Sequence, residues 1–199
     1  MPKVSRPVPR PKIRMEEFMN KAIRLSLVAL CAVILIAALR AQAPQGPPKP
    51  GSEHEKLAYF VGKWASEGEA KATPFGPGGK YSAIETCDWF AGKFAVVCKT
   101  EGNMMGGQLK GMSVLSYDTY QKSYIYFETN NWGENVYSRG GVNGDTWTWN
   151  NDTPMGDKTV HGRFTMKQTS PDTATYKFEM ASGSDPMTLV MEGKQTRQK

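Results

Sequence analysis

The feature that most constrains this fold is the residue pattern from Gly62 onward, where no helical periodicity is sustained. Short runs of alternating apolar and polar residues follow one another, separated by Gly, Asn, Asp and Pro. A period of two is typical of strands that bury one face, and the separating residues are typical of turns. The pattern predicts ten strands, at 62–71, 79–90, 94–102, 108–118, 123–130, 134–142, 145–150, 158–168, 173–182 and 187–196.

Ten consecutive strands at nearly even spacing predict an antiparallel meander. An open sheet of that size would expose two edges, and the sequence offers no second layer of helices to cover a face. Closure removes both edges, and a barrel of ten strands has more room inside than one of eight, which side chains can fill. We therefore expect an all-β fold, a single up-and-down antiparallel β-barrel.

Residues 1–43 differ from the rest of the chain. A basic segment up to Arg24 precedes an uncharged run of 15 residues from Leu25 to Leu39, and Ala41-Gln42-Ala43 follows. This order is typical of a signal peptide, because a membrane-spanning helix needs about 20 apolar residues. We expect 1–43 to be a cleaved signal peptide that exports the protein to the periplasm or the medium. An uncleaved membrane anchor through 25–39 is the alternative.

The whole net charge lies in the same segment. The chain has a formal net charge of +6, but residues 1–43 hold eight of its 25 Lys and Arg and two of its 19 Asp and Glu. The remainder is electrically balanced and has no basic footprint for a phosphate backbone. We expect no nucleic-acid partner, and a membrane contact only through the N-terminal segment.

The Pro-rich stretch at 44–51 predicts an extended linker, and we place the barrel domain at 52–199. Ser52 followed by Glu55 is a capping-box pattern, which predicts one short helix with Ser52 as its N-cap. Leu57 and Phe60 would face the barrel from this helix and cap one end.

Two cysteines follow the signal segment, Cys87 and Cys98, and they flank a predicted hairpin. A two-residue type II′ turn at Gly92-Lys93 brings Cys87 opposite Cys98. This register predicts a disulfide, which suits an oxidising compartment. If the turn lies one residue earlier, the register slips and two free thiols lie on neighbouring strands.

Asn143-Gly144 is the strongest short-range hairpin signal in the chain. A two-residue turn there places Trp147 opposite Gly140. The same register places Trp149 opposite Ser138. We interpret this face as the barrel interior, where large side chains opposite small ones can fill a tapering core.

The opening Gly62-Lys63-Trp64 resembles the Gly-x-Trp start of calycin barrels, the lipocalins and fatty-acid-binding proteins. In those folds the Trp plugs the bottom of the barrel beneath a short helix. The resemblance implies that role for Trp64.

Further motifs extend the likeness along the chain. They are Glu67-Gly68, Met104-Met105-Gly106-Gly107, Gly111, Tyr117-Asp118, Lys122-Ser123-Tyr124, Ser170-Pro171-Asp172, Phe178-Glu179-Met180 and Val190-Met191-Glu192-Gly193-Lys194. With the opening tripeptide, they make the stretch from Leu57 to Arg197 resemble the bacterial family of domain of unknown function 1579. That family carries no established activity, so the resemblance implies a lipocalin-like barrel and no reaction.

The last predicted hairpin is similar to that of nitrobindin-type haem barrels, at Met180-Ala181 and Pro186-Met187-Thr188. In that family a His two residues after the Thr binds the haem iron, and this chain has Val190 there. Because Val190 cannot ligate iron, the resemblance implies the barrel and argues against haem. We expect no cofactor.

The sequence shows no recognisable catalytic or metal-binding pattern. His54 in the predicted helix and His161 on the polar face of a strand are expected at the surface. No His, Cys or carboxylate cluster has metal-ligand spacing, and no Ser or Cys stands in a nucleophile context. Glu67 and Glu69 share one face of the first strand, which indicates an exposed row of charges. An enzyme is therefore the least favoured hypothesis.

Aromatic residues exceed what a small core needs, and Tyr and Trp combine apolar area with one polar group, which suits an amphipathic ligand. We expect a small apolar or amphipathic molecule in the barrel interior. Its predicted lining is Trp64, Tyr124, Tyr126, Trp147 and Trp149. Strands also favour aromatics for packing alone. A filled barrel that serves as a structural or protein-interaction module of the cell envelope is the alternative.

Overall fold

The computed structural model describes residue 19, residues 48–74 and residues 77–199. The predicted signal peptide, except for residue 19, and the first half of the predicted linker lie outside these residues. Residues Lys49–Lys199 form one compact unit. Within the described residues, no helix combines the length and apolar character needed to cross a bilayer.

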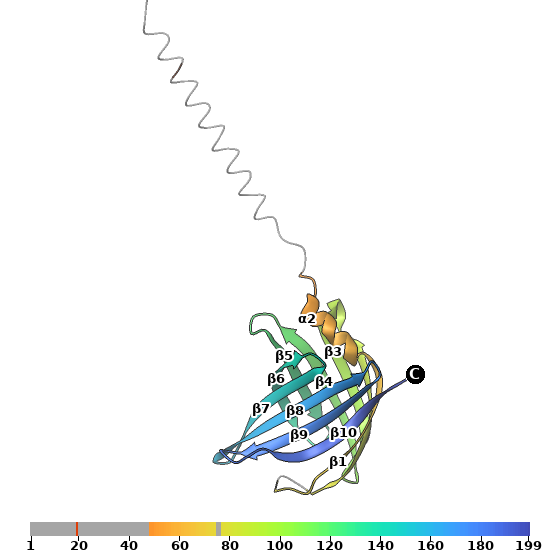
Figure 1. Cartoon of the computed structure of the whole chain (residues 1–199), viewed down its shortest axis with the longest axis vertical. Helices are drawn as coiled ribbons and strands as arrows, with labels where there is room; N and C mark the ends of the chain where they lie inside the picture. The colour runs from red at the N-terminus through yellow and green to blue at the C-terminus, as the bar shows by residue number, and fades with distance from the viewer. Residues whose placement is uncertain (1–18, 20–47, 75–76) are drawn as a thin grey trace, which may run out of the picture. The chain divides into compact units, whose positions relative to one another are not determined.

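Ten strands form a closed antiparallel barrel in which each strand pairs with its neighbours in sequence and β1 pairs with β10 (Figure 1). The strands are β1 Gly62–Ala70, β2 Gly79–Trp89, β3 Ala95–Met104, β4 Gly107–Asp118, β5 Ser123–Asn130, β6 Asn135–Asn143, β7 Thr146–Met155, β8 Lys158–Ser170, β9 Thr173–Ser182 and β10 Thr188–Gln198. All ten predicted strands are present, and the all-β, up-and-down barrel is confirmed.

Alternation along each strand decides which side chains reach the interior. On β1, Trp64 and Ser66 are buried, whereas Glu67 and Glu69 are exposed. Lys71 lies 3.3 Å from Glu69 in an ion pair. Glu67 and Glu69 therefore form the exposed row of charges that the sequence indicated.

Strand β7 is longer than predicted and runs through Pro154 to Met155. The turn-forming residues Asn151, Asp152 and Pro154 led us to end this strand at residue 150. Beyond Asn150, however, β7 pairs with β8 and no longer with β6. A proline is tolerated there because its missing N–H faces the side without a partner strand.

One end of the barrel is covered by α2 (Ser52–Glu55) and the 3₁₀ helix η1 (Lys56–Phe60) (Figure 1). Leu57 is fully buried, and Phe60 packs against the buried core. The predicted capping helix is thus confirmed, with Leu57 and Phe60 on its inner side.

The start of this helix differs from the prediction by one residue. The N-cap is Gly51, and its backbone N–H donates to Nδ1 of His54 at 3.2 Å, the role that we had given to Glu55. The shift turns His54 inward, where it is 4 % exposed and meets Phe94 and Tyr117 edge-on. The expectation of a surface position for His54 was wrong.

The disulfide between Cys87 and Cys98 is present, and the two residues lie directly opposite each other on β2 and β3. The predicted register is confirmed, but the turn type differs. Gly92 and Lys93 both have positive φ, of 79° and 60°, where a type II′ turn needs this only at the first position. The turn is a short 3₁₀ segment, η2 (Ala91–Lys93).

The β6–β7 hairpin has the predicted faces but another register. Trp149 lies opposite Gly140, and Trp147 lies opposite Val142. The turn is one residue later than predicted, because Asn143 pairs with Thr146 and Gly144, at φ +59°, takes the first turn position. A register change of two residues leaves every side chain on its predicted face.

Gly140 is required by this register. A Cβ atom added there would overlap the carbonyl oxygen of Thr148, whereas a Cβ at Gly141 would meet nothing within 4 Å. We expect Gly140→Ala to lower the free energy of unfolding by about 1–3 kcal/mol, as overpacking does. Gly141→Ala is the matched control, with an expected change within about 0.5 kcal/mol. Urea denaturation measures both, and equal effects would contradict the register.

The disulfide should contribute to stability by restricting the unfolded chain. We expect Cys87→Ala with Cys98→Ala to lower the free energy of unfolding by about 2–4 kcal/mol. Dithiothreitol should destabilise the wild-type protein and leave the double variant unchanged. A wild-type protein whose denaturation midpoint ignores the reductant would show that the bond is not formed in solution.

Candidate functional site

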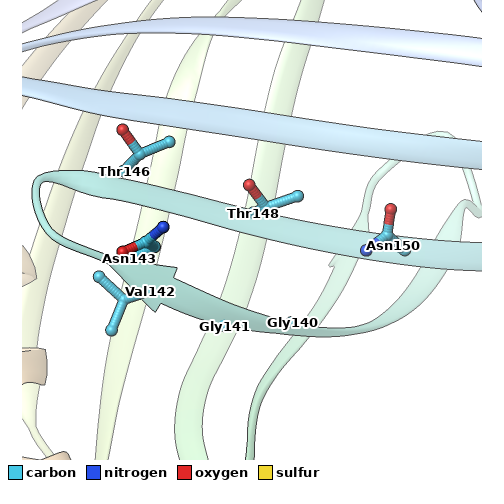
Figure 2. Close-up of a pocket in the computed structure, with 7 residues that line it drawn as sticks. All are labelled: Gly140, Gly141, Val142, Asn143, Thr146, Thr148 and Asn150. Atoms are coloured by element: carbon cyan, nitrogen blue, oxygen red, sulfur yellow. The ribbon is translucent and has the colours of Figure 1, made fainter.

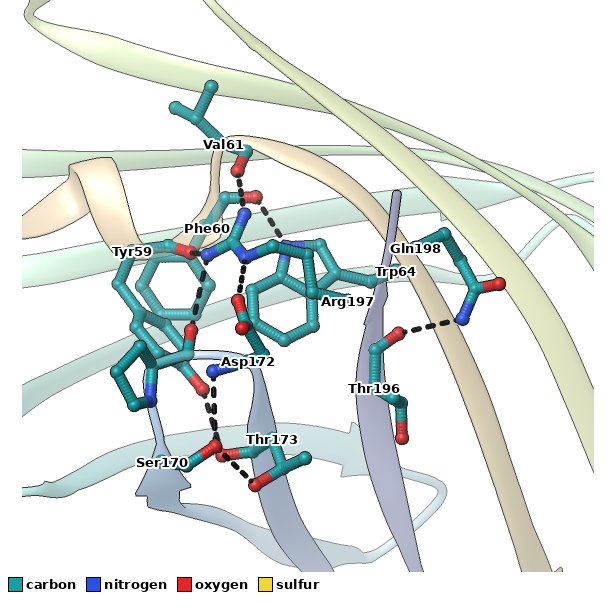
Figure 3. Close-up of polar contacts among 11 residues, drawn as sticks. Tyr59, Phe60, Val61, Trp64, Ser170, Asp172, Thr173, Thr196, Arg197 and Gln198 are labelled. Atoms are coloured by element: carbon teal, nitrogen blue, oxygen red, sulfur yellow. Dashed lines mark hydrogen bonds and ion pairs between the residues drawn. The ribbon is translucent and has the colours of Figure 1, made fainter.

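The capped end of the barrel is closed by Trp64 and Arg197. The guanidinium of Arg197 lies 4.2 Å from the ring centroid of Trp64 and donates to the carbonyl oxygens of Val61 at 2.6 Å and Tyr59 at 3.0 Å (Figure 3). Its Nε also bonds Asp172 at 3.0 Å. Trp64 is 3 % exposed and donates its indole N–H to the carbonyl of Phe60. Trp64 therefore plugs the base beneath the helix.

Above this plug lies a packed aromatic layer, which we call the aromatic floor. Its members are Phe60, Tyr124, Trp147 and Trp149. The two indoles are stacked with centroids 5.5 Å apart, and Phe60 meets the Trp147 ring edge-on at 4.9 Å. The Tyr124 hydroxyl donates to the carboxylate of Glu53 on the helix at 2.6 Å. Four predicted lining residues, Trp64, Tyr124, Trp147 and Trp149, thus lie in the plug and the floor.

The fifth predicted lining residue, Tyr126, belongs to a different environment. It lies one inward position beyond Tyr124 on β5, and its hydroxyl donates to the carboxylate of Glu128. Gln195 on β10 donates to the carboxylate of Glu85 on β2 at 3.1 Å. Together with neighbouring tyrosines these side chains form what we call the interior cluster. It consists of Tyr81, Glu85, Tyr126, Glu128, Tyr176 and Gln195.

Three members of the interior cluster are only partly buried. Glu85, Tyr126 and Glu128 occupy inward positions of their strands, yet each keeps partial exposure, while inward neighbours such as Cys87 and Tyr124 are buried. The aromatic floor is closed by comparison, since Trp147 is 1 % exposed. The barrel interior therefore has a packed base and a polar, accessible region above it.

The charge of Glu128 acts on Glu85. Burial, and then the negative charge of Glu128, raises the pKa of Glu85 to about 7, against the opposing hydrogen bond from Gln195. Burial also raises the pKa of Glu128, although the hydrogen bond from Tyr126 partly offsets it. A carboxyl group with a pKa near neutrality can bind or exchange a proton at physiological pH. Among the described residues, we therefore take Glu85 and Glu128 as the best candidates for a functional site.

Two buried hydroxyl groups, one in the cluster and one beside it, have no hydrogen-bond partner in the described structure. Ser66 is 2 % exposed and Tyr176 is 6 % exposed. Tyr176 lies across Gly193 and Gly68, where an added Cβ would collide with its hydroxyl group. These glycines make room for the ring, whose hydroxyl interacts electrostatically with Glu85. Buried polar groups normally have partners, so these hydroxyls mark a place where a bound molecule can supply one.

No metal centre is found in the part of the chain that the structure describes, where no group of three or more His, Cys, Asp or Glu could hold an ion. His161 lies at the surface, as expected, with Nδ1 2.6 Å from the carboxylate of Asp152. Val190 lies on β10 at an irregularity in its pairing with β9. The absence of haem stays a prediction from that residue.

A surface pocket of about 610 Å³ lies along the β6–β7 hairpin (Figure 2). Its lining consists of Gly140, Gly141, Val142, Asn143, Thr146, Thr148 and Asn150. None of these side chains titrates, and Thr146, Thr148 and Asn150 alternate with the buried Trp147 and Trp149, so they lie on the outer face. This pocket offers no chemistry comparable to that of the interior cluster.

The sequence carried a signal for Glu85 that our reasoning missed. In the segment 81–89, the odd positions hold Tyr81, Ala83, Cys87 and Trp89, which are more apolar than the even ones. Glu85 is the single ionisable carboxyl group on that inward face, and a charge in such a position suggests function. Glu128 gave a weaker signal, because both faces of its strand carry apolar residues.

Residues 49–197 match the family described as "Protein of unknown function (DUF1579)". The chain belongs to this family. The match covers the helix and all ten strands except the last residue of β10, and it confirms the resemblance drawn from the sequence motifs. Comparison with curated proteins gives no match.

Two solved structures share the barrel fold of this DUF1579 member. Rv2717c from M. tuberculosis aligns with a TM-score of 0.54 at 14 % identity, over 75 % of this chain and 99 % of that one. The S-type phycobiliprotein lyase CPES from Guillardia theta aligns with a TM-score of 0.52 at 14 % identity, over 75 % of this chain and 94 % of that one. At this identity the likeness shows a lipocalin-like fold and nothing of the activity.

Ionisation of Glu85 should cost stability. Its folded-state pKa of about 7 lies above the ordinary value of 4.5, so the folded protein binds more protons between these values, and the free energy of unfolding falls as pH rises through them. We expect Glu85→Gln to remove this loss and to stabilise the protein at about pH 8 by up to about 2–3 kcal/mol. At about pH 5 the variant should match the wild type.

Urea denaturation at both pH values provides the measurement. Glu101→Gln on the neighbouring strand β3 is the control, because Glu101 is exposed and its loss should change neither value. A wild-type stability that is flat between the two pH values would contradict the raised pKa of Glu85.

Proposed function

We propose that this DUF1579 protein is a binding protein that holds one small amphipathic molecule inside its barrel. The observation that carries the proposal is the accessible interior cluster, in which Glu85, Tyr126 and Glu128 keep solvent contact at inward positions. Burial raises the pKa values of both carboxyl groups, which means that keeping them charged costs free energy. A barrel that served only as a filled scaffold would have no use for groups with that cost.

The proposed site has an apolar side and a polar side. The Tyr126 ring lies 6.2 Å from the Trp149 ring, so it links the aromatic floor to the interior cluster. Phe164 stacks on Tyr176 with centroids 5.8 Å apart, and both rings face inward. A molecule with an apolar body and a polar head can satisfy both surfaces, as is typical of pockets lined by aromatics and a few placed polar groups.

A filled barrel acting as an interaction module of the cell envelope is the second candidate. The dense packing of the aromatic floor favours it for the capped half of the barrel, where Leu57 and Trp147 are essentially inaccessible. The partial exposure of the interior cluster argues against it for the rest.

We propose that the protein works outside the cytoplasm. The basic and apolar composition of residues 1–43 supports export, and so does the disulfide of the barrel, because disulfides persist in oxidising compartments. Immunoblotting of cell fractions tests this proposal, and a full-length protein found only in the cytoplasmic fraction would refute it.

Native mass spectrometry of the full chain, expressed with export and purified gently, tests interior binding. We expect a reproducible extra mass of one small molecule per barrel, recoverable by solvent extraction. Tyr126→Ala should lose most of it, because this ring faces the interior. The matched control is Phe127→Ala, which truncates the next aromatic residue on the outer face of the same strand. An apo mass for the wild type would favour the filled module, and equal loss in both variants would move the site out of the interior.

A further inference from the structure

The interior of the barrel holds two carboxyl groups that have no basic partner among the described residues. Glu85 and Glu128 both face inward, and no basic side chain contributes to the pKa of either one. A hydrogen bond from Gln195 reaches Glu85, and one from Tyr126 reaches Glu128, but both donors are neutral. Ionised carboxylates in such a place are normally paired with a cation.

The cations of the barrel are engaged elsewhere. On the described strands the lysines lie at outward positions, except Lys158, which is exposed at the very start of β8. Arg139 and Arg163 also point outward, toward Asp118 and Glu179. Arg197 occupies an inward position, but its guanidinium is held at the capped end by two carbonyl groups and Asp172. The charge that would complete the interior cluster therefore has to come from outside the described chain.

An independent observation points to a bound molecule at the same place. The hydroxyl groups of Ser66 and Tyr176 are more than nine-tenths buried and unpartnered within the described residues. Ser66 lies between Gln195 and Ala83 in the sheet, and Gln195 is the residue that bonds Glu85. Tyr176 lies across two glycines toward Tyr81 and Glu85. Both hydroxyl oxygens can accept a hydrogen bond from an N–H group.

The tyrosine rings of the interior cluster also favour a bound cation. Tyr81, Tyr126 and Tyr176 each interact electrostatically with Glu85, and the negative face of an aromatic ring attracts an ammonium group. Partly buried Phe164 and Met191 lie beside them and offer apolar surface.

We propose that the interior cluster binds the protonated nitrogen of a small amphipathic amine between Glu85 and Glu128. The apolar body of the amine rests on the Tyr126, Phe164 and Met191 side chains, and the hydroxyls of Ser66 and Tyr176 accept its remaining N–H groups. This inference rests on the proposed function, because it assigns a ligand class to the same site.

The proposal sets the direction of the pH dependence. Lowering the pH protonates Glu85, whose pKa is raised to about 7, and removes part of the attraction for the cation. The titratable groups that face Glu85 are Glu128, Tyr81, Tyr126 and Tyr176. The three tyrosines stay neutral, because burial raises their pKa values above the ordinary value. Amine affinity should therefore fall as pH decreases through about 7.

Three probes of equal chain length test the assignment on the full-length exported protein after ligand extraction. They are octylamine, 1-octanol and octanoate, titrated at about pH 8 and followed by calorimetry and Trp fluorescence. We expect octylamine to bind at least tenfold more tightly than 1-octanol, and octanoate to bind most weakly.

Carboxamide variants locate the interaction. Glu85→Gln and Glu128→Gln should each weaken octylamine binding about tenfold and leave 1-octanol binding unchanged, whereas Glu101→Gln, on the outer face, should change neither. Because 1-octanol binding reports an intact interior, a misfolded variant is recognised by the loss of both probes. Glu85→Ala is a second variant at the same position, and it should also weaken octylamine binding without loss of 1-octanol binding.

The outcomes separate this inference from the proposed function. Equal affinity for the three probes, or octylamine binding that ignores both substitutions, overturns the amine assignment and leaves interior binding standing. If no probe binds, the amine assignment fails, and native mass spectrometry of the exported protein decides on interior binding separately.

Discussion

The structure depends on the contact between Trp64 and Arg197, because it joins the first strand of the barrel to the last. The guanidinium covers the indole face and donates to the backbone carbonyl groups of Tyr59 in η1 and of Val61, just before β1. Every other pair of neighbouring strands in the barrel is also adjacent in sequence, so β1 and β10 are the pair that must meet across the whole length of the domain. The aromatic floor, the helix cap and the interior cluster all presuppose that closure, since each uses side chains from several strands around the ring.

The interior of the closed barrel has two regions, which differ in packing and in polarity. Near the helix, aromatic rings pack edge to face or stack on one another and exclude water. Farther along the barrel, glycines replace bulky residues and tyrosines surround two carboxyl groups. Proteins usually avoid such buried charge, and where it persists at a cost in stability it commonly serves binding or catalysis. The stable floor thus supports a less stable site.

Much of the fold could be predicted because strand faces follow directly from alternation. All ten strands, the disulfide register and the inward faces of Trp147 and Trp149 follow from residues that are close in sequence. The turn after Asn143 was misplaced by one residue, because the sequence does not show which residue of the Asn-Gly pair takes the first turn position. His54 was misjudged for a similar reason, since a shift of one residue rotates a short helix.

The candidate site was harder to predict, because it is built from strands that are distant along the chain. Glu85 on β2 meets Gln195 on β10, and only barrel closure brings the two together. The sequence predicted Tyr126 as a lining residue, but it did not separate that residue from the aromatics of the floor. Whether an inward aromatic packs or lines a space is decided by its neighbours across the barrel, and alternation within one strand does not contain that information.

The pairing of β1 with β10 also has a consequence for the order of events during synthesis. β1 emerges from the ribosome first among the strands, but one of its two edges stays without a partner until β10 has been made. Hairpins can form early, whereas the closed barrel cannot, so cooperative folding is deferred until the last strand is available. Until then the chain is not folded, and an unfolded chain is the form that can pass through a narrow secretion channel.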